Sequence, residues 1–279
     1  MKKSKWRLLL TGYNDGPTNM AIDEALFLNQ NDKGSKYSGT LRFYFWKPPT
    51  ISLGYFQKAE EILDLKKCSK LNIGVVRRST GGWAIYHSVE ITYSITASLP
   101  SDVVPSDIGL SYKVLTGFMV KTLQKIGINS NERGKTIESH DNFYCFVNPS
   151  KYDIITVGKK IIGSAQRRNK KSFLQHGSIL LNMNDIGKMF SVFKESSDKK
   201  SLIEEYKDNV ITIEEVLGKK VDAAELVDLL AYNFEKVFNV ELILDGLTDT
   251  EKSLIDTLKQ GYIPLGLSLR KGCIMKKIL

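Results

Sequence analysis

The chain has 279 residues, of which 42% are hydrophobic and 25% charged, and its formal net charge is +9. This composition excludes a disordered or fibrous chain, and the length is sufficient to bury a large core. The sequence contains no apolar run of membrane-spanning length, and the apolar run near its start is too short for a secretory signal. The positive charge favours an acidic partner, without choosing among nucleic acid, anionic lipid and acidic protein.

The cysteines are widely spaced and odd in number, so we expect no disulfide framework and a reducing, cytoplasmic location. They are Cys68, Cys145 and Cys273. The histidines are isolated in the sequence and there is no C-x-x-C motif, so we expect no metal site. They are His87, His140 and His176.

The first part of the chain is predicted to form a strand, one helix and two more strands. Thr18 is a plausible N-cap of a helix that ends near residue 30. Asp23 and Glu24 would then lie in its early turns, where carboxylates interact favourably with the helix dipole. The two strands, residues 41–46 and 50–54, are separated by prolines, which cannot donate to a central ladder.

The stretch 74–95 predicts a strand, a tight turn and two further strands. Arg77 and Arg78 lie at the end of the first strand, and Gly81 and Gly82 follow in the turn. Glycine pairs adopt positive φ and let the backbone approach a ligand closely. Free N–H groups in such a turn can bind carbonyl oxygens or anions. The alternative is an ordinary Gly-Gly hairpin with two solvated arginines.

Two helices and two hairpin strands are expected around this stretch. The helices are predicted over residues 59–71 and 107–126, and the hairpin over residues 152–166. A basic tip, residues 167–172, then leads into a further strand, residues 173–181. The tip could grip nucleic acid, or it could be a solvated hairpin end.

Beyond residue 183 the apolar spacing is mostly helical. Strands followed by helices, joined by connections shorter than parallel crossovers require, predict an α+β fold. We expect a mixed, mainly antiparallel sheet flanked by helices. The main domain is predicted over residues 1–245. A C-terminal helix and basic tail, residues 246–279, are predicted to pack on the same domain.

Four blocks along the chain are similar to those of the lipoate/octanoate attachment family, within the biotin/lipoate protein ligase superfamily. They read N-x-A-x-D-E from residue 19, RR-x-x-GG-x-x-x-x-H from residue 77, GKK-x-x-GSAQ from residue 158 and HG-S-x-L-L from residue 176. The chain most resembles the octanoyltransferases that also carry a cysteine just before the lysine-bearing hairpin. That cysteine is Cys145 here.

The resemblance implies the fold of biotin protein ligase and class II synthetase catalytic domains, and it implies two catalytic residues. Cys145 matches the acyl-accepting thiol of the family, and Lys160 matches its essential lysine. A nearby ammonium group raises the thiolate fraction of a cysteine and can stabilise an oxyanion. Taken alone, Cys145 is typical of a structural cysteine between aromatic neighbours, and Lys160 of a lysine at a strand edge.

The implied reaction moves an octanoyl group from octanoyl-acyl carrier protein to Cys145, and then to a lysine of a lipoyl-domain protein such as the glycine cleavage H protein. One thioester exchanges for another, so we expect no ATP and no other cofactor. Neither a membrane nor nucleic acid is expected as a partner. The remaining candidates are predicted to bind substrate, and they are Arg77, Gly81, Gly82, His87, Gly163, Ser164, Ala165, His176 and Gly177. The alternative for either histidine is a structural residue at a strand end, with its ring nitrogens hydrogen-bonded to the backbone.

Two positions depart from the family pattern. Ser88 stands where the family often has an aspartate after the histidine. Trp83 stands where ATP-dependent lipoate ligases usually carry a third glycine, and its bulk argues against a nucleotide at this turn. A lipoate–protein ligase is nevertheless the alternative function. A non-catalytic nucleic-acid-binding module related to synthetase folds is a more distant alternative, favoured by the net charge and the basic tip.

Overall fold

The computed structural model describes residues 3–31, 35–134, 150–183, 185–194 and 199–262. Cys145, Cys273 and His140 lie outside these residues. None of the helices in the described ranges is both long and apolar enough to cross a lipid bilayer.

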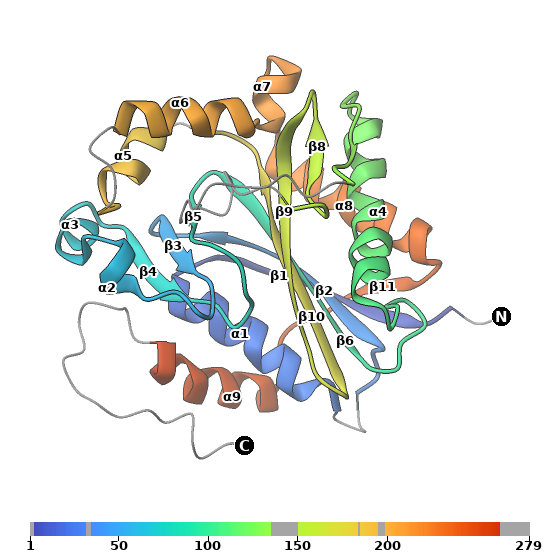
Figure 1. Ribbon diagram of the computed structural model, residues 1–279. Coiled ribbons are helices and arrows are strands. Elements are labelled where there is room, and N and C mark those ends of the chain that lie inside the picture. The colour runs from blue at the N-terminus through green and yellow to red at the C-terminus, as the bar shows by residue number, and fades with distance from the viewer. Residues whose placement is uncertain (1–2, 32–34, 135–149, 184, 195–198, 263–279) are drawn as a thin grey trace.

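The largest element is an eight-stranded mixed sheet with the order β11-β1-β2-β6-β10-β9-β8-β7 (Figure 1). β1 runs parallel to both of its neighbours, and the other pairs are antiparallel. The predicted α+β class with a mixed, mainly antiparallel sheet is therefore confirmed. The strands are β1 (Lys5–Asn14), β2 (Gly39–Trp46), β6 (Glu90–Ser98), β7 (Asn131–Glu132), β8 (Ile154–Thr156), β9 (Lys159–Arg168), β10 (Ser172–Leu180) and β11 (Glu241–Leu244).

A second, three-stranded sheet has the order β4-β3-β5. Its strands are β3 (Thr50–Leu53), β4 (Gly74–Arg77) and β5 (Ile85–His87). β4 is parallel to β3, and β5 is antiparallel to β3. Because β3 lies between them, β4 and β5 are not paired with each other. The interpretation of this stretch as a Gly-Gly hairpin is therefore wrong. The loop between β4 and β5 passes over the end of β3 instead.

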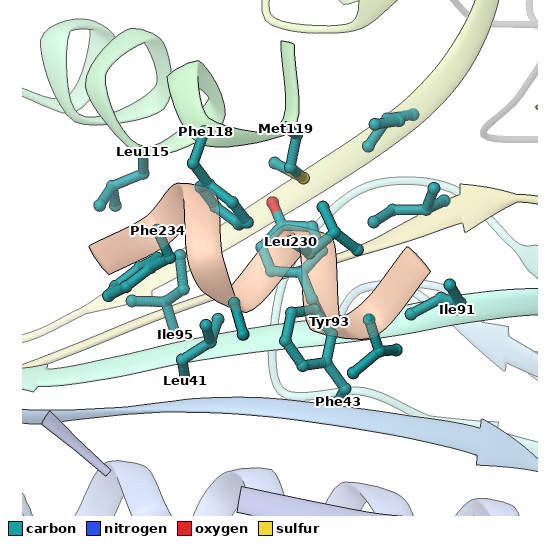
Figure 2. Packing of buried hydrophobic residues seen from close by; sticks show 14 of the residues in the cluster. Leu41, Phe43, Ile91, Tyr93, Ile95, Leu115, Phe118, Met119, Leu230 and Phe234 are labelled. Atoms are coloured by element: carbon teal, nitrogen blue, oxygen red, sulfur yellow. The ribbon is translucent and has the colours of Figure 1, made fainter. Parts of the chain in front are cut away.

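Helices cover both faces of the large sheet (Figure 1). On one face α4 and α8 pack against β2 and β6 (Figure 2). The rings of Phe118 and Phe234 meet edge to face there, with their centroids 5.3 Å apart. On the other face lie α1 and α9. The helices are α1 (Gly16–Leu28), α2 (Ala59–Ile62), α3 (Leu65–Lys70), α4 (Ile108–Lys125), α5 (Ile186–Ser191), α6 (Lys199–Asn209), α7 (Ile213–Leu217), α8 (Ala223–Phe238) and α9 (Asp249–Lys259).

The N-terminus of α1 differs from the prediction. Asp15, and not Thr18, is the N-cap: its Oδ1 accepts a hydrogen bond of 2.8 Å from the backbone N–H of Thr18. Pro17 lies in the first turn, where its missing N–H costs no hydrogen bond. Asp23 therefore lies in the middle of the helix, too far from its N-terminus to interact with the dipole there.

The helix predicted over residues 59–71 is two short helices. Leu63 has extended backbone angles, and the Asp64 side chain accepts from Lys67 N, which begins α3. A local N-cap thus interrupts an apolar spacing that is otherwise helical. Cys68 on α3 is buried, as expected for a small apolar residue.

The last described helix, α9, packs on α1 through a small apolar cluster that includes Ile22 and Ile255. A buried ion pair reinforces this contact, since Arg7 of β1 binds both carboxylate oxygens of Glu251 at 2.6 and 2.8 Å. The division of the chain at residue 245 stays a prediction, and most of the tail, residues 263–279, lies outside the described part.

We predict that Glu251→Ala lowers the free energy of unfolding by about 3 kcal/mol, because it leaves the buried Arg7 guanidinium without its counter-charge. Denaturant unfolding measures the change. Lys252→Ala on the same helix is the control, since its ion pair with Asp249 is exposed. Its effect should stay below about 1 kcal/mol. Equal losses in the two variants would contradict this role of the buried pair.

Candidate active site

A cavity of about 460 Å³ is lined by residues of both sheets, of α1 and of the loop between β4 and β5. Nine of the predicted site residues line it, and they are Gly81, Gly82, His87, Lys160, Gly163, Ser164, Ala165, His176 and Gly177. Arg77 is not among the lining residues, and its Nε donates to the carbonyl oxygen of Gln57. The other predicted catalytic residue, Cys145, is outside the described residues.

A β-bulge turns Lys160 toward the cavity. Ile155 of β8 pairs with Lys160 of β9, but the next partner, Ile154, pairs with Ile162, so Ile161 is an additional residue in the strand. A bulge shifts the alternation of side chains along a strand. Ile161 and Ile162 consequently both join the hydrophobic core, and Lys160 lines the cavity with its side chain 2% exposed.

A buried carboxylate neutralises the ammonium of Lys160. Its Nζ lies 2.9 Å from Oδ1 of Asp153, and both side chains are 2% exposed. The other oxygen, Oδ2, accepts from the backbone N–H of Ser150 at 2.8 Å. The lysine stem runs across Gly163, where an added Cβ would lie 2.6 Å from Lys160 Cε. Gly163 thus provides the space that the lysine side chain occupies.

Arg78 holds the loop between β4 and β5 in place. Its guanidinium is buried and donates to the carbonyl oxygens of Ser52, Gly81 and Trp83 at 2.8–2.9 Å. The interpretation of Arg78 as a solvated arginine is therefore wrong. Gly82 in this loop has φ +90°, a conformation that favours glycine.

A buried carboxylate–histidine–hydroxyl chain connects α1 to the same loop. Asp23 Oδ2 lies 3.0 Å from His176 Nδ1, and His176 Nε2 lies 2.7 Å from Oγ1 of Thr80. Burial lowers the pKa of His176 against the opposing effect of Asp23, and the positive charge of Arg78 lowers it further. A neutral imidazole is therefore the favoured form at neutral pH.

Asp23 has hydrogen-bond partners on both oxygens. Oδ1 accepts from Arg42 at 2.6 Å and from Ser94 at 2.8 Å, while Oδ2 accepts from Tyr44 at 2.8 Å. Burial raises the pKa of Asp23, but Arg42, His176 and Ser94 together outweigh it and lower the pKa to about 2. The carboxylate is thus ionised at neutral pH.

His87 is the middle member of a second such chain. Its Nδ1 lies 2.8 Å from Oε1 of Glu90, and its Nε2 lies 2.7 Å from Oγ of Ser52. The ring stacks on Trp46 at 4.1 Å with an interplanar angle of 10°. Both cavity histidines are thus bonded by side chains, so the interpretation that the backbone satisfies them is wrong.

Several residues of the site were not predicted from the sequence, chiefly Arg42, Tyr44, Ser52 and Glu90. A signal was present for two of them. Arg42 interrupts the otherwise apolar strand LRFYFW, and Glu90 opens another buried strand. A charge at a core position requires a buried partner, so each marks a polar network.

The match to a known family covers the core of the chain: residues 15–235 correspond to the lipoyl protein ligase A/B catalytic domain. The chain belongs to this family. Octanoyltransferase LipM of Moorella thermoacetica is 39% identical over 94% of this chain and 97% of its own length. Octanoyltransferase LipM of Clostridioides difficile is 37% identical over 93% and 96%. These relatives confirm the predicted family and the prediction of an octanoyltransferase enzyme.

Solved structures of the same family superpose on the chain. A bipartite lipoate protein ligase from Thermoplasma acidophilum has a TM-score of 0.76 at 25% identity, covering 97% of this chain and all of the other. Lipoate-protein ligase A bound with ATP has a TM-score of 0.74 at 26% identity, covering 93% and 95%. The fold is therefore shared with lipoate protein ligases.

We predict that Gly163→Ala lowers transfer activity by about 100-fold, because the added methyl group displaces Lys160, the predicted catalytic lysine, and a misplacement of about 1 Å can have that effect. Single-turnover rates measure the loss. Gly117→Ala in α4 is the control, since an added Cβ there meets nothing within 4 Å. Equal activities in the two variants would show that the position of Lys160 does not matter.

A second prediction concerns acid stability. The pKa of Asp23 is about 2 in the folded protein against an ordinary 3.8, so its ionised form stabilises the fold at higher pH. This contribution, about 2 kcal/mol, is present above pH 4 and is lost as the pH falls toward 2. The stability difference between wild type and Asp23→Asn should narrow over that range in urea titrations. Asp249→Asn, an exposed control, should show no such narrowing.

Proposed function

We propose that this enzyme transfers an octanoyl group from octanoyl-acyl carrier protein to Cys145, and from there to a lysine of a lipoyl-domain protein. The glycine cleavage H protein is the expected acceptor. The observation that carries the proposal is the buried Lys160 ammonium in the cavity wall. The names of the octanoyltransferase relatives support the choice of acyl group.

In the proposed reaction the Cys145 thiolate attacks the carbonyl carbon of the donor thioester, the carbon–sulfur bond to the carrier breaks, and the carrier leaves as its thiolate. The ε-amine of the acceptor lysine then attacks the new thioester, an amide forms, and the Cys145 thiol is regenerated. Lys160 would stabilise the thiolate and each oxyanion. Because Asp153 holds its Nζ at 2.9 Å, the ammonium is fixed in place before the substrate arrives.

The cavity suits a medium-length acyl chain. Its volume of about 460 Å³ falls within the range of roughly 300–1,000 Å³ that is usual for small-molecule sites. Met20, Tyr44, Trp46 and Ile85 give part of its wall an apolar character. Gly81 and Gly82 of the loop line it too, so the loop backbone can lie near the acyl carbonyl.

Cys68, the one cysteine among the described residues, is unsuited to the role of nucleophile. Its side chain is buried, and burial together with Asp64 raises the pKa of its thiol to about 11. Such a thiol is almost fully protonated at neutral pH and unreactive. The proposed nucleophile Cys145 requires a reducing compartment to stay free, in keeping with a cytoplasmic location.

An ATP-dependent lipoate–protein ligase is the second candidate, favoured by the structural likeness to a ligase bound with ATP. Trp83 lines the cavity within the glycine loop, where it would crowd a nucleotide. Two arginines of the basic tip bind other parts of the protein: Arg167 pairs with Glu24 at 3.0 Å, and Arg168 donates to Ser111. These contacts weaken the nucleic-acid-binding alternative, which needs the arginines to bind phosphates.

Incubation with octanoyl-acyl carrier protein without ATP should add one octanoyl group to Cys145, seen by intact mass and removed by hydroxylamine. Cys145→Ala should abolish the adduct and the transfer, whereas Cys68→Ala should change neither. Cys145→Ser should also fail, because an unassisted hydroxyl is far less nucleophilic than a thiolate. ATP-dependent loading of free lipoate by Cys145→Ala would establish the ligase instead.

Lys160→Ala should fold and form the Cys145 adduct at least about 100-fold more slowly, because a cation is lost at both attack and oxyanion stages. Rapid-quench mass spectrometry measures the rate. Lys159→Ala is the matched control, since this neighbouring lysine donates to the carbonyl oxygen of Lys207 at the surface. An unchanged rate in Lys160→Ala would remove Lys160 from the mechanism.

A further inference from the structure

Ser52, His87 and Glu90 are connected in the geometry of a serine–histidine–carboxylate triad. Ser52 Oγ lies 2.7 Å from His87 Nε2, and His87 Nδ1 lies 2.8 Å from Glu90 Oε1. Such triads are recognised by their geometry on unrelated folds and not by their order in the sequence. Ser52 and His87 both line the cavity, but Ser52 is fully buried and His87 is 4% exposed, so only an acyl group that enters the cavity can meet them.

The strand register brings these residues together. β3 and β5 are antiparallel, with Thr50 opposite His87 and Ser52 opposite Ile85. Ser52 and His87 are therefore diagonal neighbours on the same face of the small sheet. Glu90 follows at the start of β6, three residues after His87. The arrangement depends on β3 lying beside β5, which the sequence pattern did not predict.

Trp46 fixes the orientation of the imidazole. Its ring stacks on His87 at 4.1 Å, and its Nε1 donates to Thr92 Oγ1 at 2.7 Å. Thr92 in turn donates to Glu90 Oε1, which also accepts from Ser178 at 2.8 Å. An oxygen that already accepts two hydrogen bonds acts as an acceptor for Nδ1–H as well, which leaves Nε2 unprotonated to accept a hydrogen bond from the Ser52 hydroxyl.

The two carboxylate–histidine chains of the cavity differ in one respect. Asp23 is paired with the Arg42 guanidinium at 2.6 Å, which neutralises its charge. Glu90 pairs with no lysine or arginine among the described residues, and its Oε2 has no hydrogen-bond partner there. Among the described residues, His87 is the one ionisable side chain that is hydrogen-bonded to Glu90.

A cation lies beside Ser52, at the opposite end of the Glu90–His87–Ser52 hydrogen-bonded series from the carboxylate. Nη1 of Arg78 donates to Ser52 Oγ at 3.2 Å and to the Ser52 carbonyl oxygen at 2.9 Å. A guanidinium at this distance stabilises a developing alkoxide on Oγ and an oxyanion formed next to it. Base, nucleophile and stabilising charge are thus aligned at one wall of the cavity.

We propose that Ser52 is a second nucleophile, which accepts an acyl group from a thioester and releases it to water. Ser52 Oγ bonds to the acyl carbon while its proton passes to His87 Nε2. That proton then goes to the departing thiol as the carbon–sulfur bond breaks. Water, deprotonated by His87, attacks the acyl-serine, and the carboxylic acid leaves as Ser52 regains its proton. Glu90 positions the imidazole. This activity does not require Cys145.

The test uses the full-length Cys145→Ala protein, so it does not depend on the proposed transferase mechanism. A fluorophosphonate should phosphonylate Ser52 Oγ with loss of fluoride, and peptide mass mapping should place the adduct there. His87→Gln should slow labelling at least about 100-fold. Thr257→Val, which removes an exposed hydroxyl of α9 outside the cavity, should leave labelling of Ser52 intact. The S-octanoyl thioester of N-acetylcysteamine should be hydrolysed to octanoate, and Ser52→Ala should abolish this hydrolysis.

The role of Glu90 is tested by Glu90→Gln, which keeps the shape of the side chain and removes its charge. Labelling of Ser52 should slow while the melting temperature changes little. The proposal is overturned if no adduct forms, if it maps to another residue, or if it forms at the same rate in His87→Gln. It is also overturned if thioester hydrolysis persists in Ser52→Ala. In each of these cases Ser52 is only a hydrogen-bond partner of His87.

Discussion

The ion pair between Asp23 and Arg42 is the interaction on which the site depends. The two side chains are buried between α1 and the large sheet and lie 2.6 Å apart. Arg42 also donates to the carbonyl and the side-chain oxygens of Asn19, and its guanidinium lies 3.8 Å from the centre of the Tyr44 ring. Removal of either charge would leave the other without its counter-charge in the core, which destabilises the fold. The position of α1 on the sheet is thereby fixed.

The same pair also fixes residues of the cavity wall. Asp23 orients His176, which binds Thr80 in the loop that Arg78 organises from the other side. The cavity wall thus contains several buried charges, and each is held by hydrogen bonds or a counter-charge. A wall of fixed charges can stabilise the charges that develop in acyl transfer without rearranging, which is the main advantage of a preorganised site.

Much of the cavity wall could be predicted from the sequence because its glycine- and histidine-bearing blocks resemble those of the family, and the resemblance implies which residues bind substrate. Gly82 needs its positive φ, and Gly163 makes room for Lys160. Two structural alternatives are wrong for a common reason. Asp23 does not serve the helix dipole and Arg78 is not solvated, because a local pattern cannot show which distant residue shares a buried space with a charge. Cys145 stays a prediction.

By itself the sequence determined the α+β class, most strands and the family, since apolar periodicity and short motifs are properties of neighbouring residues. Tertiary structure alone decided that β3 inserts between β4 and β5, that a bulge at Ile161 turns Lys160 inward, and that Glu90 meets His87 and Ser52. Strand order and register arise from competition among all possible pairings for one core. That competition involves the whole chain, and no single stretch of sequence records its outcome.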